Sequence, residues 1–534
     1  MSKHTHPTRR TFVQGAAGLV AAGALAAPAL AQATESSAKD SAASTKRWSW
    51  ESAPAPVTDI VRTEDVDIVV VGGGIAGVTA TWSAAKAGAS VTCVEKTDQV
   101  QGRSMFIGAI NAQVQKDAGV PEYNSLEIMQ EMHRFQGGFV MPDLYKMYLD
   151  NSGMVWDKLA ELAKANGAEP LYMGDGSLKQ VDHPYYSEYT TMMYITPTNA
   201  ELVSYLQADA EESGATFAFN SPAEQLVVDG DKVTGVICKT QEGYVQYNAA
   251  EGVVMATGDY SGNPEMMQAW APMSATYADF SMYTPAGANS GDGLAMMMWA
   301  GAVMQPCDEH APMIHCLGGA TGSANAWLRV NANGERYENE DVPNAQVCYG
   351  RFMQPGNKAW AIYDANCGTY AAQMTYGFGR SASVTQENLD ADVENGLALR
   401  ADTLEELAEL MGVPSAAFAT TVARYNELCE AGEDADYGKD AANLTPVDTA
   451  PFYAAPIKAP LLVMLGGINV DKYLRVCNAE NQPIEGLYAI GNCSGNYYAV
   501  DYPAIIPGMS HGRCVTTGYL IGEALAKGTL IGQE

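Results

Sequence analysis

A glycine-rich turn between two apolar segments, within residues 66–95, constrains this chain most. Residues 66–71 are rich in valine and predict a buried strand, and residues 75–87 are mostly small and predict a helix. A second strand is predicted over residues 90–94, and it ends at Glu95. A strand, a glycine turn, a helix and a second strand in this order predict a β-α-β unit with parallel strands.

The glycines of this turn, Gly72, Gly74 and Gly77, have the G-x-G-x-x-G spacing of dinucleotide-binding folds. The first glycine allows the tight turn, the second lets backbone N–H groups approach a pyrophosphate, and the third lets the helix pack on the strand. The helix N-terminus adds partial positive charge for the phosphates. Glu95 is placed to accept hydrogen bonds from the ribose hydroxyls. An ordinary glycine turn is the alternative, but the complete β-α-β setting favours dinucleotide binding.

Composition excludes several other classes of protein. The 534 residues, 47% hydrophobic and 17% charged, suit a globular protein of two or more domains. A formal net charge of -31 makes nucleic acid an unsuitable partner, because phosphate binding requires clustered Lys and Arg. None of the ten cysteines forms C-x-x-C, so no zinc-ribbon, iron–sulfur or c-type haem site is expected. The 25 methionines are interpreted as core residues and not as a metal site.

The N-terminal segment is predicted to be a targeting signal. Arg9 and Arg10 resemble a twin-arginine export motif, an apolar run covers residues 16–27, and an A-x-A cleavage site ends at Ala31. We therefore expect a signal peptide over residues 1–31, and export to the periplasm or the outer face of the membrane. No other run of about 20 apolar residues occurs, so the mature protein is expected to be soluble or peripheral.

Further elements follow along the chain. Residues 32–62, rich in Ala, Ser, Thr and Pro, are interpreted as a flexible linker. Apolar residues recur at helical spacing over residues 125–154, and a second helix with polar N-cap candidates is predicted to reach Glu212. Residues 225–239 predict a β-hairpin, and residues 252–256 a short buried strand.

Several motifs in one order then resemble a single group of flavoproteins. They are the opening glycine motif, residues 253–258, residues 291–293, residues 334–340 and residues 486–491. Together they resemble the fumarate reductase / succinate dehydrogenase flavoprotein superfamily, which includes the flavocytochrome c fumarate reductases, the urocanate reductases and the 3-ketosteroid dehydrogenases. The helical segment 421–426 also resembles part of the capping domain of that superfamily, but it carries no chemistry.

The resemblance implies an α/β protein whose Rossmann-like FAD-binding domain is split in sequence by an inserted α+β capping domain. It implies an FAD-binding domain formed by residues 63–300 and 461–534, with the cap over residues 301–460. The residues that the landmarks of the superfamily and their neighbours suggest for FAD are Gly72, Gly74, Ile75, Ala76, Gly77, Glu95, Lys96, Arg103, Ser104, Gly108, Ala109, Gly258, Asp259, Asp292, Gly491, Asn492 and Ser510.

The carboxylate-binding residues of the fumarate reductases are mostly missing. In that group, a cap arginine donates the proton, and His and Arg side chains bind the substrate carboxylates. His310 matches the first histidine by spacing, but the proton-donor position holds Ser323, and Arg329 is the nearest basic residue. The second histidine aligns with Val463, and residues 502–508 contain no arginine where the last one is expected. Fumarate is therefore not the expected substrate.

A different motif takes their place. Tyr502 and Gly508 lie in a stretch that resembles the Y-P-G-x-G-x-x-x-G segment of the ketosteroid dehydrogenases, with about two residues inserted. In that group, the tyrosine hydroxyl and a glycine N–H bind the substrate ketone, as donors that stabilise a developing oxyanion do. A packed aromatic residue is the alternative role for Tyr502. His511 and Arg513 begin the last predicted helix, and either side chain would stabilise a reduced, anionic flavin or face the substrate. For His511, a purely structural role is the other interpretation.

Three hypotheses for function follow. The first is an exported FAD-dependent reductase that transfers hydride from flavin N5 to a carbonyl-conjugated C=C bond in anaerobic respiration. Its candidate catalytic residues are Tyr502, His310, Arg513, Gly508 and Arg329. The second is a 3-ketosteroid-type dehydrogenase that works in the oxidative direction, and a non-alkene acceptor such as a sulfoxide is also open. The third, an electron-transfer flavoprotein, is disfavoured because a cap serves to exclude water from chemistry. Without a C-x-x-C-H haem motif, electrons are expected from a separate multihaem cytochrome or membrane flavoprotein.

Overall fold

The computed structural model describes residues 48–104, 106–182, 186–307, 309–316, 319–374 and 384–533. The predicted signal peptide, residues 1–31, lies outside the described residues. The chain divides into two compact units, Met1–Ser52 and Ala53–Glu534. In the first unit, the described residues form a short 3-10 helix, η1 (Ser49–Glu51). The rings of Trp50, in this helix, and Trp48, its N-cap, stack with their centres 6.4 Å apart. All other elements belong to the second unit.

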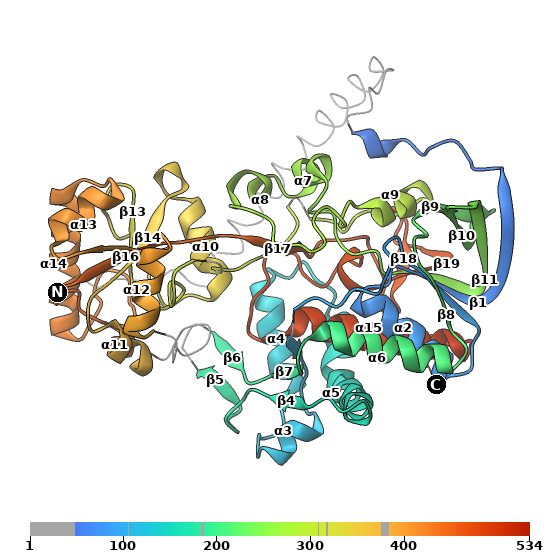
Figure 1. Ribbon diagram of the computed structural model, residues 1–534, viewed down its shortest axis with the longest axis horizontal. Helices are drawn as coiled ribbons and strands as arrows, with labels where there is room; N and C mark the ends of the chain where they lie inside the picture. Colours follow the sequence, from blue (N-terminus) through green and yellow to red (C-terminus); the bar gives the residue numbers. More distant parts are fainter. Residues whose placement is uncertain are drawn as a thin grey trace, which may run out of the picture. The chain divides into compact units, whose positions relative to one another are not determined.

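The second unit is built on an eight-stranded sheet whose centre is parallel (Figure 1). Its parallel neighbours are, in order, β8 (Thr216–Ala218), β2 (Val91–Val94), β1 (Ile60–Val71), β11 (Gly243–Met255) and β19 (Pro483–Ala489). Antiparallel pairs are added by β9 (Ala223–Asp229), β10 (Lys232–Thr240) and β18 (Arg475–Cys477). The predicted α/β class is confirmed. Because β1 and β19 flank β11, segments from both halves of the sequence share one sheet.

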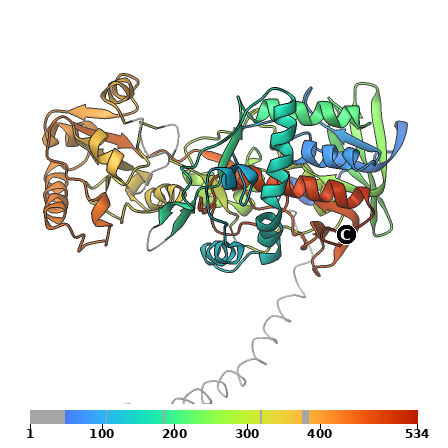
Figure 2. The same ribbon diagram turned by 90° about the horizontal axis from the view of Figure 1, so that it is seen from below.

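Three helices run side by side next to this sheet: α2 (Ile75–Lys86), α6 (Asn199–Glu212) and α15 (Met509–Ala526) (Figures 1 and 2). Helix α15 packs on α2 at backbone distance, because a Cβ at Gly518 would lie 2.5 Å from the Ala76 carbonyl oxygen. A Cβ at Gly522 would lie 2.3 Å from the Ala80 carbonyl oxygen, so the two helices are parallel. The beginnings of α2 and α15 therefore point toward the same side of the sheet.

Most elements predicted from the sequence are present. Helix α6 begins after Thr198, whose hydroxyl caps it, and the predicted hairpin is β9–β10. The expected strand over residues 252–256 is the end of β11. The helical spacing over residues 125–154 belongs to two helices, α4 (Ser125–Phe135) and α5 (Pro142–Ala165). Gly137 and Gly138 separate them, because both have a positive φ that a continuing helix excludes.

A separate antiparallel sheet lies within residues 328–456, in the order β13 (Leu328–Asn331), β14 (Ala359–Tyr363), β16 (Phe452–Pro456) and β15 (Leu399–Ala401). It has its own hydrophobic core, which includes Trp360, Phe418 and Tyr425. The helices near it are α12 (Gln386–Glu394), α13 (Leu404–Met411) and α14 (Ser415–Ala431), drawn in yellow and orange in Figure 1. The strands that precede and follow this segment, β12 (Pro312–Ile314) and β17 (Leu461–Met464), pair with each other.

A buried ionic cluster holds the second sheet to the loop that follows α14. Arg336 donates hydrogen bonds to both carboxylate oxygens of Glu340, at 2.8 Å each, and to Asp434 at 3.0 and 2.7 Å. Lys439 lies 3.3 Å from Glu340, and all of these side chains are buried. Arg336 and Glu340 belong to the segment 334–340 that resembles a family motif, and both charges are paired within this cluster.

The remaining elements complete the second unit. They are β3 (Phe106–Gly108), β4 (Pro170–Tyr172), β5 (Lys179–Asp182), β6 (Ser187–Tyr189), β7 (Met192–Ile195), α3 (Gln113–Asp117), α7 (Pro264–Trp270), α8 (Pro272–Tyr277), α9 (Asp292–Trp299), α10 (Asn344–Phe352), α11 (Cys367–Gln373), η2 (Pro355–Asn357), η3 (Ala441–Asn443) and η4 (Gly491–Cys493). Among the helices of the described residues, none has both the length and the apolar character that a membrane crossing requires. The described residues also contain no group of three or more His, Cys, Asp and Glu side chains arranged to hold a metal ion.

Candidate functional site

The glycine turn after β1 is fixed by close backbone contacts. Gly72 has a φ of +108°, and a Cβ there would lie 2.6 Å from the Ala256 carbonyl oxygen of the neighbouring strand. A Cβ at Gly77 would lie 1.9 Å from the Gly72 carbonyl oxygen. Both positions therefore require glycine for reasons internal to the fold. The predicted β-α-β unit is present, with β1 and β2 parallel.

Gly74 is different, because nothing in the chain requires glycine there. It is the N-cap residue of α2 with a φ of -76°, and a Cβ would meet no atom within 4 Å. The space in front of it is the wall of a cavity, and the α2 N-terminus opens toward that space. A glycine with an ordinary φ and open space before it fits a backbone that a ligand approaches closely.

Glu95 stands at the end of β2, as the motif predicts, and it is buried. One carboxylate oxygen accepts a hydrogen bond from the Gly73 N–H at 2.6 Å, and the other accepts from the backbone N–H of Thr97 at 2.8 Å and from its hydroxyl. The side chain thus braces the glycine turn, and it also lines the cavity.

The cavity has a volume of about 590 Å³. Thirteen of the seventeen residues predicted to hold the cofactor line it: Gly72, Gly74, Ile75, Ala76, Glu95, Lys96, Arg103, Ser104, Gly258, Asp292, Gly491, Asn492 and Ser510. The other four, Gly77, Gly108, Ala109 and Asp259, are not part of its lining. Asp259 is fully buried and accepts hydrogen bonds from Ser261 and Asn289, so its carboxylate shapes the turn after β11.

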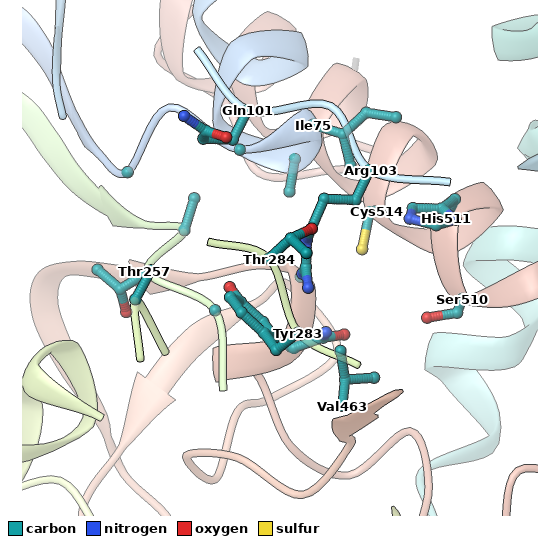
Figure 3. Close-up of a pocket in the computed structure, with 18 of the residues that line it drawn as sticks. Ile75, Gln101, Arg103, Thr257, Tyr283, Thr284, Val463, Ser510, His511 and Cys514 are labelled. Atoms are coloured by element: carbon teal, nitrogen blue, oxygen red, sulfur yellow. The ribbon is translucent and has the colours of Figure 1, made fainter. Parts of the chain in front are cut away.

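The two basic residues of the cavity lining, Lys96 and Arg103, each contact a neighbouring side chain. Lys96 lies 3.3 Å from the Ser290 hydroxyl and 3.5 Å from Asp292, the first residue of α9. The Arg103 guanidinium lies 3.6 Å from the centre of the Tyr283 ring. Figure 3 shows this pair meeting in the cavity, with side chains of α15 on one side. Lys96 and Arg103 are the only lysine and arginine among the described lining residues.

The far end of the cavity is formed by segments distant in sequence. Pairing of β12 with β17 places Met313 opposite Val463, and both residues line the cavity. The His315 ring contacts the Tyr502 ring edge-on, with their centres 5.6 Å apart. Leu462 and Ala504 complete a largely apolar chamber. No sequence motif predicted that Met313 or Tyr283 would line the cavity. Val463 was named only as the residue that replaces the second histidine of the fumarate reductases.

Tyr502 is held by the start of α15. Its hydroxyl oxygen accepts a hydrogen bond from the Ser510 N–H at 3.2 Å, and the ring is buried in the cavity wall. Burial raises the pKa of Tyr502 to about 12, against the opposing effect of this backbone N–H. The hydroxyl therefore stays protonated at neutral pH, and its proton is free for a ligand oxygen. Gly508, the N-cap of α15, has a φ of +79° and approaches Gly108, which only glycine allows.

The other predicted catalytic residues do not line the cavity. His310 stacks on Trp270 and shares a hydrogen bond with Tyr260 at 2.8 Å. Arg329 is fully buried in β13 and forms an ion pair with Glu338 at 2.9 Å. Spacing matched His310 to a substrate-binding histidine, whereas Arg329 was a candidate only as the basic residue nearest to the unmatched proton-donor position, Ser323. Arg513 lies behind Asn492 and not in the lining.

Comparison with known proteins identifies the cofactor. The sequence profile of a family described as FAD binding domain matches residues 67–503. The chain belongs to this family. Its cofactor is FAD, and the residues present fit it: the open backbone at Gly74 faces the cavity, the acid Glu95 ends β2, and the cavity continues from them to Tyr502.

Relatives lie in the predicted flavoprotein superfamily. The chain is 26% identical over 500 residues to a NADH:acrylate oxidoreductase of Vibrio harveyi, covering 82% of this chain and 48% of that protein. It is 27% identical over 504 residues to a vinyl phenol reductase of Lactiplantibacillus plantarum, covering 88% and 98%. It thus spans about half the length of the first relative and nearly all of the second.

Solved structures agree on the fold. The open conformation of a flavocytochrome c3 fumarate reductase matches with a TM-score of 0.64 and 23% identity, over 90% of this chain and 83% of that one. A 3-ketosteroid-delta4-(5alpha)-dehydrogenase from Rhodococcus jostii matches with a TM-score of 0.70 and 22% identity, over 89% of this chain and 99% of that one.

Two glycine substitutions separate ligand contact from folding. We expect Gly74→Ala to lower the stability of the FAD-free protein by no more than about 1 kcal/mol, because its Cβ meets no atom and only the N-cap preference for Gly over Ala is lost. It should weaken FAD binding at least tenfold, because the methyl group occupies the cradle. Gly77→Ala should instead destabilise the protein without FAD, because the Cβ collides with Gly72. FAD titration followed by absorbance and thermal unfolding measure the two effects. Equal FAD affinity of Gly74→Ala and the wild type would contradict the assignment.

The buried histidines predict acid sensitivity. Burial lowers the pKa of His310, His315 and His511 to about 4, whereas an unfolded histidine titrates near 6.5. Below pH 6.5 the unfolded chain therefore binds more protons, and the free energy of unfolding falls as pH decreases toward 4. A shift of this size corresponds to about 3 kcal/mol for each of the two fully buried histidines, His310 and His315. His310→Gln should reduce the fall by up to that amount, measured by urea unfolding at several pH values.

A buried acid gives a control of opposite sign. Burial raises the pKa of Asp501 to about 6, so its contribution to stability is complete below pH 3.8 and is lost as pH rises through 6. Asp501→Asn removes that contribution and should make the acid-induced fall steeper. The same pH dependence in His310→Gln and the wild type would show that His310 is not neutral in the folded protein.

Proposed function

We propose that this chain is an FAD-dependent oxidoreductase of CH–CH bonds that reduces an activated C=C bond in a small, uncharged, carbonyl-conjugated acceptor. The observation that carries the proposal is the far end of the cavity, where the Tyr502 hydroxyl meets the N-terminus of α15 inside an apolar chamber. Reduced FAD supplies the hydride in this reaction. An electron donor outside the chain restores it, and that donor is part of the proposal.

Tyr502 supplies the polar contact that such a substrate needs. Hydride addition to the β-carbon moves an electron pair onto the conjugated oxygen, and a fixed hydroxyl donor stabilises that charge. The Ser510 N–H occupies a lone pair of the Tyr502 oxygen, so the hydroxyl proton is left to point to the substrate. Burial excludes water, which strengthens this hydrogen bond. The enolate oxygen then takes the Tyr502 proton, the enol tautomerises to the saturated carbonyl compound, and solvent returns a proton to Tyr502.

The charge of the lining supports an uncharged substrate. Lys96 is engaged by Ser290 and Asp292, and Arg103 packs on Tyr283. At the chamber end, the described lining offers Met313, Leu462 and Val463, and burial keeps His315 neutral at pH 7 because its pKa falls to about 4. The described lining offers a dicarboxylate one cation without a carboxylate partner, Arg103, so one of the two carboxylates stays unpaired, and burying an unpaired carboxylate is costly. One relative is named for vinyl phenol, a small uncharged alkene, and another for acrylate, a small alkene that carries one carboxylate.

The oxidative direction is the second candidate. The Tyr502 arrangement stabilises the same enolate whichever way hydride moves, and a 3-oxosteroid 1-dehydrogenase of Mycolicibacterium smegmatis is 28% identical over 364 residues.

We also propose export by the twin-arginine pathway to the periplasm or the outer face of the membrane, and a role in anaerobic respiration. Arg9 and Arg10 support the export, and they lie outside the described residues.

A reductase assay with chemically reduced viologen tests the proposal. The FAD-loaded protein is offered dicarboxylates, aryl-acrylates, enones including steroids, and sulfoxides. Turnover of enones and other uncharged conjugated alkenes is expected, with no turnover of fumarate. Efficient fumarate reduction would refute the uncharged chamber. Activity only with saturated ketones and an oxidising dye would establish the dehydrogenase direction instead.

Substitution of Tyr502 tests the role of its hydroxyl. We expect Tyr502→Phe to lower kcat about 100-fold with little change in KM, because the donor acts mainly on the charge that develops in the transition state. Tyr123→Phe is the matched control, since its hydroxyl is also buried but donates to the Thr190 carbonyl and lies outside the cavity lining. Unchanged turnover of Tyr502→Phe would leave Tyr502 as a packing residue.

A further inference from the structure

Gln136 is a buried amide whose hydrogen bonds converge on one short segment that is distant in sequence. It is the C-cap residue of α4 and is 0% exposed. Its side-chain oxygen accepts hydrogen bonds from the backbone N–H groups of Ala499, Val500 and Asp501, at 2.8, 3.0 and 3.4 Å. Its side-chain nitrogen donates to the Asp501 carbonyl oxygen at 2.8 Å. One side chain therefore holds both the donors and an acceptor of residues 499–501, which directly precede Tyr502.

The bond to the Asp501 carbonyl fixes the peptide plane from which Tyr502 begins. This carbonyl and the Tyr502 N–H belong to one planar peptide unit, so holding the carbonyl also sets the position of the Tyr502 Cα. On the other side, Pro503 disfavours helical conformations of Tyr502 and favours an extended backbone. The hydroxyl at the far end of the ring accepts from the Ser510 N–H at 3.2 Å.

The position of this hydroxyl depends strongly on the backbone because the tyrosine ring is long. A small rotation at Tyr502 moves the hydroxyl much further than it moves the Cα. In an active site, a misplacement of about 1 Å can lower the rate about 100-fold. Such groups are therefore held by hydrogen bonds from residues that do not touch the substrate. Gln136 meets this description, since it is buried and is not part of the described cavity lining.

We propose that Gln136 is a positioning residue: by holding residues 499–501, it places the Tyr502 hydroxyl against the Ser510 N–H and toward the substrate. The effect on turnover rests on the proposed function of Tyr502. The geometric part, that Gln136 sets the position of this hydroxyl, holds for any substrate. Kinetics and amide exchange therefore test the two parts separately.

A double-mutant cycle with Tyr502→Phe tests the effect on turnover. Gln136→Met removes the amide at similar length, and Gln136→Glu keeps an accepting oxygen but loses the donor to Asp501. With the FAD-loaded protein, reduced viologen and an enone, each should lower kcat about tenfold with little change in KM, because the hydroxyl acts mainly on transition-state charge. In the Tyr502→Phe background, each should lower kcat by less than about twofold, because no hydroxyl remains to be positioned. Equal losses in both backgrounds would refute the coupling.

Hydrogen exchange of the Ser510 amide, measured by mass spectrometry on the FAD-loaded protein, needs no substrate. Ser510 lies in the first turn of α15, where N–H groups have no acceptor within the helix, and its N–H donates to the Tyr502 oxygen. Tyr502→Phe should therefore speed exchange at Ser510, because the acceptor is removed. Gln136→Met and Gln136→Glu should speed it about tenfold, because the acceptor is displaced. Unchanged exchange at Ser510 in both Gln136 variants would overturn the proposal.

Gln305→Met is the matched control. Gln305 is also buried, and its amide binds the same loop further from Tyr502: the oxygen accepts from the Asn496 N–H at 2.8 Å, and the nitrogen donates to the Tyr498 carbonyl at 2.8 Å. Its loss should lower the unfolding temperature but leave kcat and Ser510 exchange close to those of the wild type, because Gln136 still holds residues 499–501. Effects as large as those of Gln136→Met would indicate a general loosening of the loop and contradict the specific role.

The two readouts separate the failure of this inference from the failure of the proposed function. If no enone is reduced, or if Tyr502→Phe keeps full turnover, the proposed function is wrong, and faster Ser510 exchange in the Gln136 variants still supports the positioning of Tyr502. If Tyr502→Phe loses turnover but the Gln136 variants show additive losses and unchanged Ser510 exchange, the proposed function stands and the positioning role is wrong.

Discussion

Backbone contact between β1, α2 and their neighbours is the constraint on which this structure depends. Gly72 lies against the Ala256 carbonyl of β11, and Gly77 lies against Gly72, so the turn has no room for a side chain at either position. Glu95 then ties the end of β2 back to this turn through the Gly73 N–H. The result is a rigid cradle whose one open glycine, Gly74, faces the FAD cavity. Rigidity favours phosphate binding, because N–H groups that are already aligned need not be ordered when the phosphate binds.

Helix α15 connects this cradle to the chemistry. Its middle packs on α2 through Gly518 and Gly522, which fixes the relative position of the two parallel helices. Its first turn supplies the Ser510 N–H that orients Tyr502 and carries Arg513 behind Asn492. One helix therefore contributes to the cavity wall, orients Tyr502 and packs on the helix that begins at the glycine turn.

The two ends of the cavity differ in charge, and the proposed choice of an uncharged substrate depends on this difference. Lys96, Glu95 and Asp292 gather at the nucleotide end, where FAD is charged. At the other end, Met313, Val463 and Tyr502 form an apolar wall with one hydroxyl, and burial holds His315 neutral. A low-dielectric chamber strengthens each hydrogen bond made inside it and penalises any unpaired charge. The proposed uncharged substrate and the proposed role of the Tyr502 hydroxyl both depend on this low dielectric.

Local patterns in the sequence determined the cofactor cradle, and long-range packing determined the substrate chamber. The glycine spacing, the valine strand and Glu95 lie within thirty residues, so the β-α-β unit was predictable. The start of α6 near Thr198 and the hairpin after Gln225 also follow local patterns, and both are present. Met313 and Val463 meet only because β12 pairs with β17 across an inserted sheet, and no local signal encodes that pairing. Spacing to a family motif suggested His310, and closeness in sequence to the proton-donor position suggested Arg329. In the structure His310 packs against Trp270, and Arg329 lies in β13. Local backbone geometry depends on neighbouring residues, but the lining of a cavity depends on which distant surfaces exclude water together.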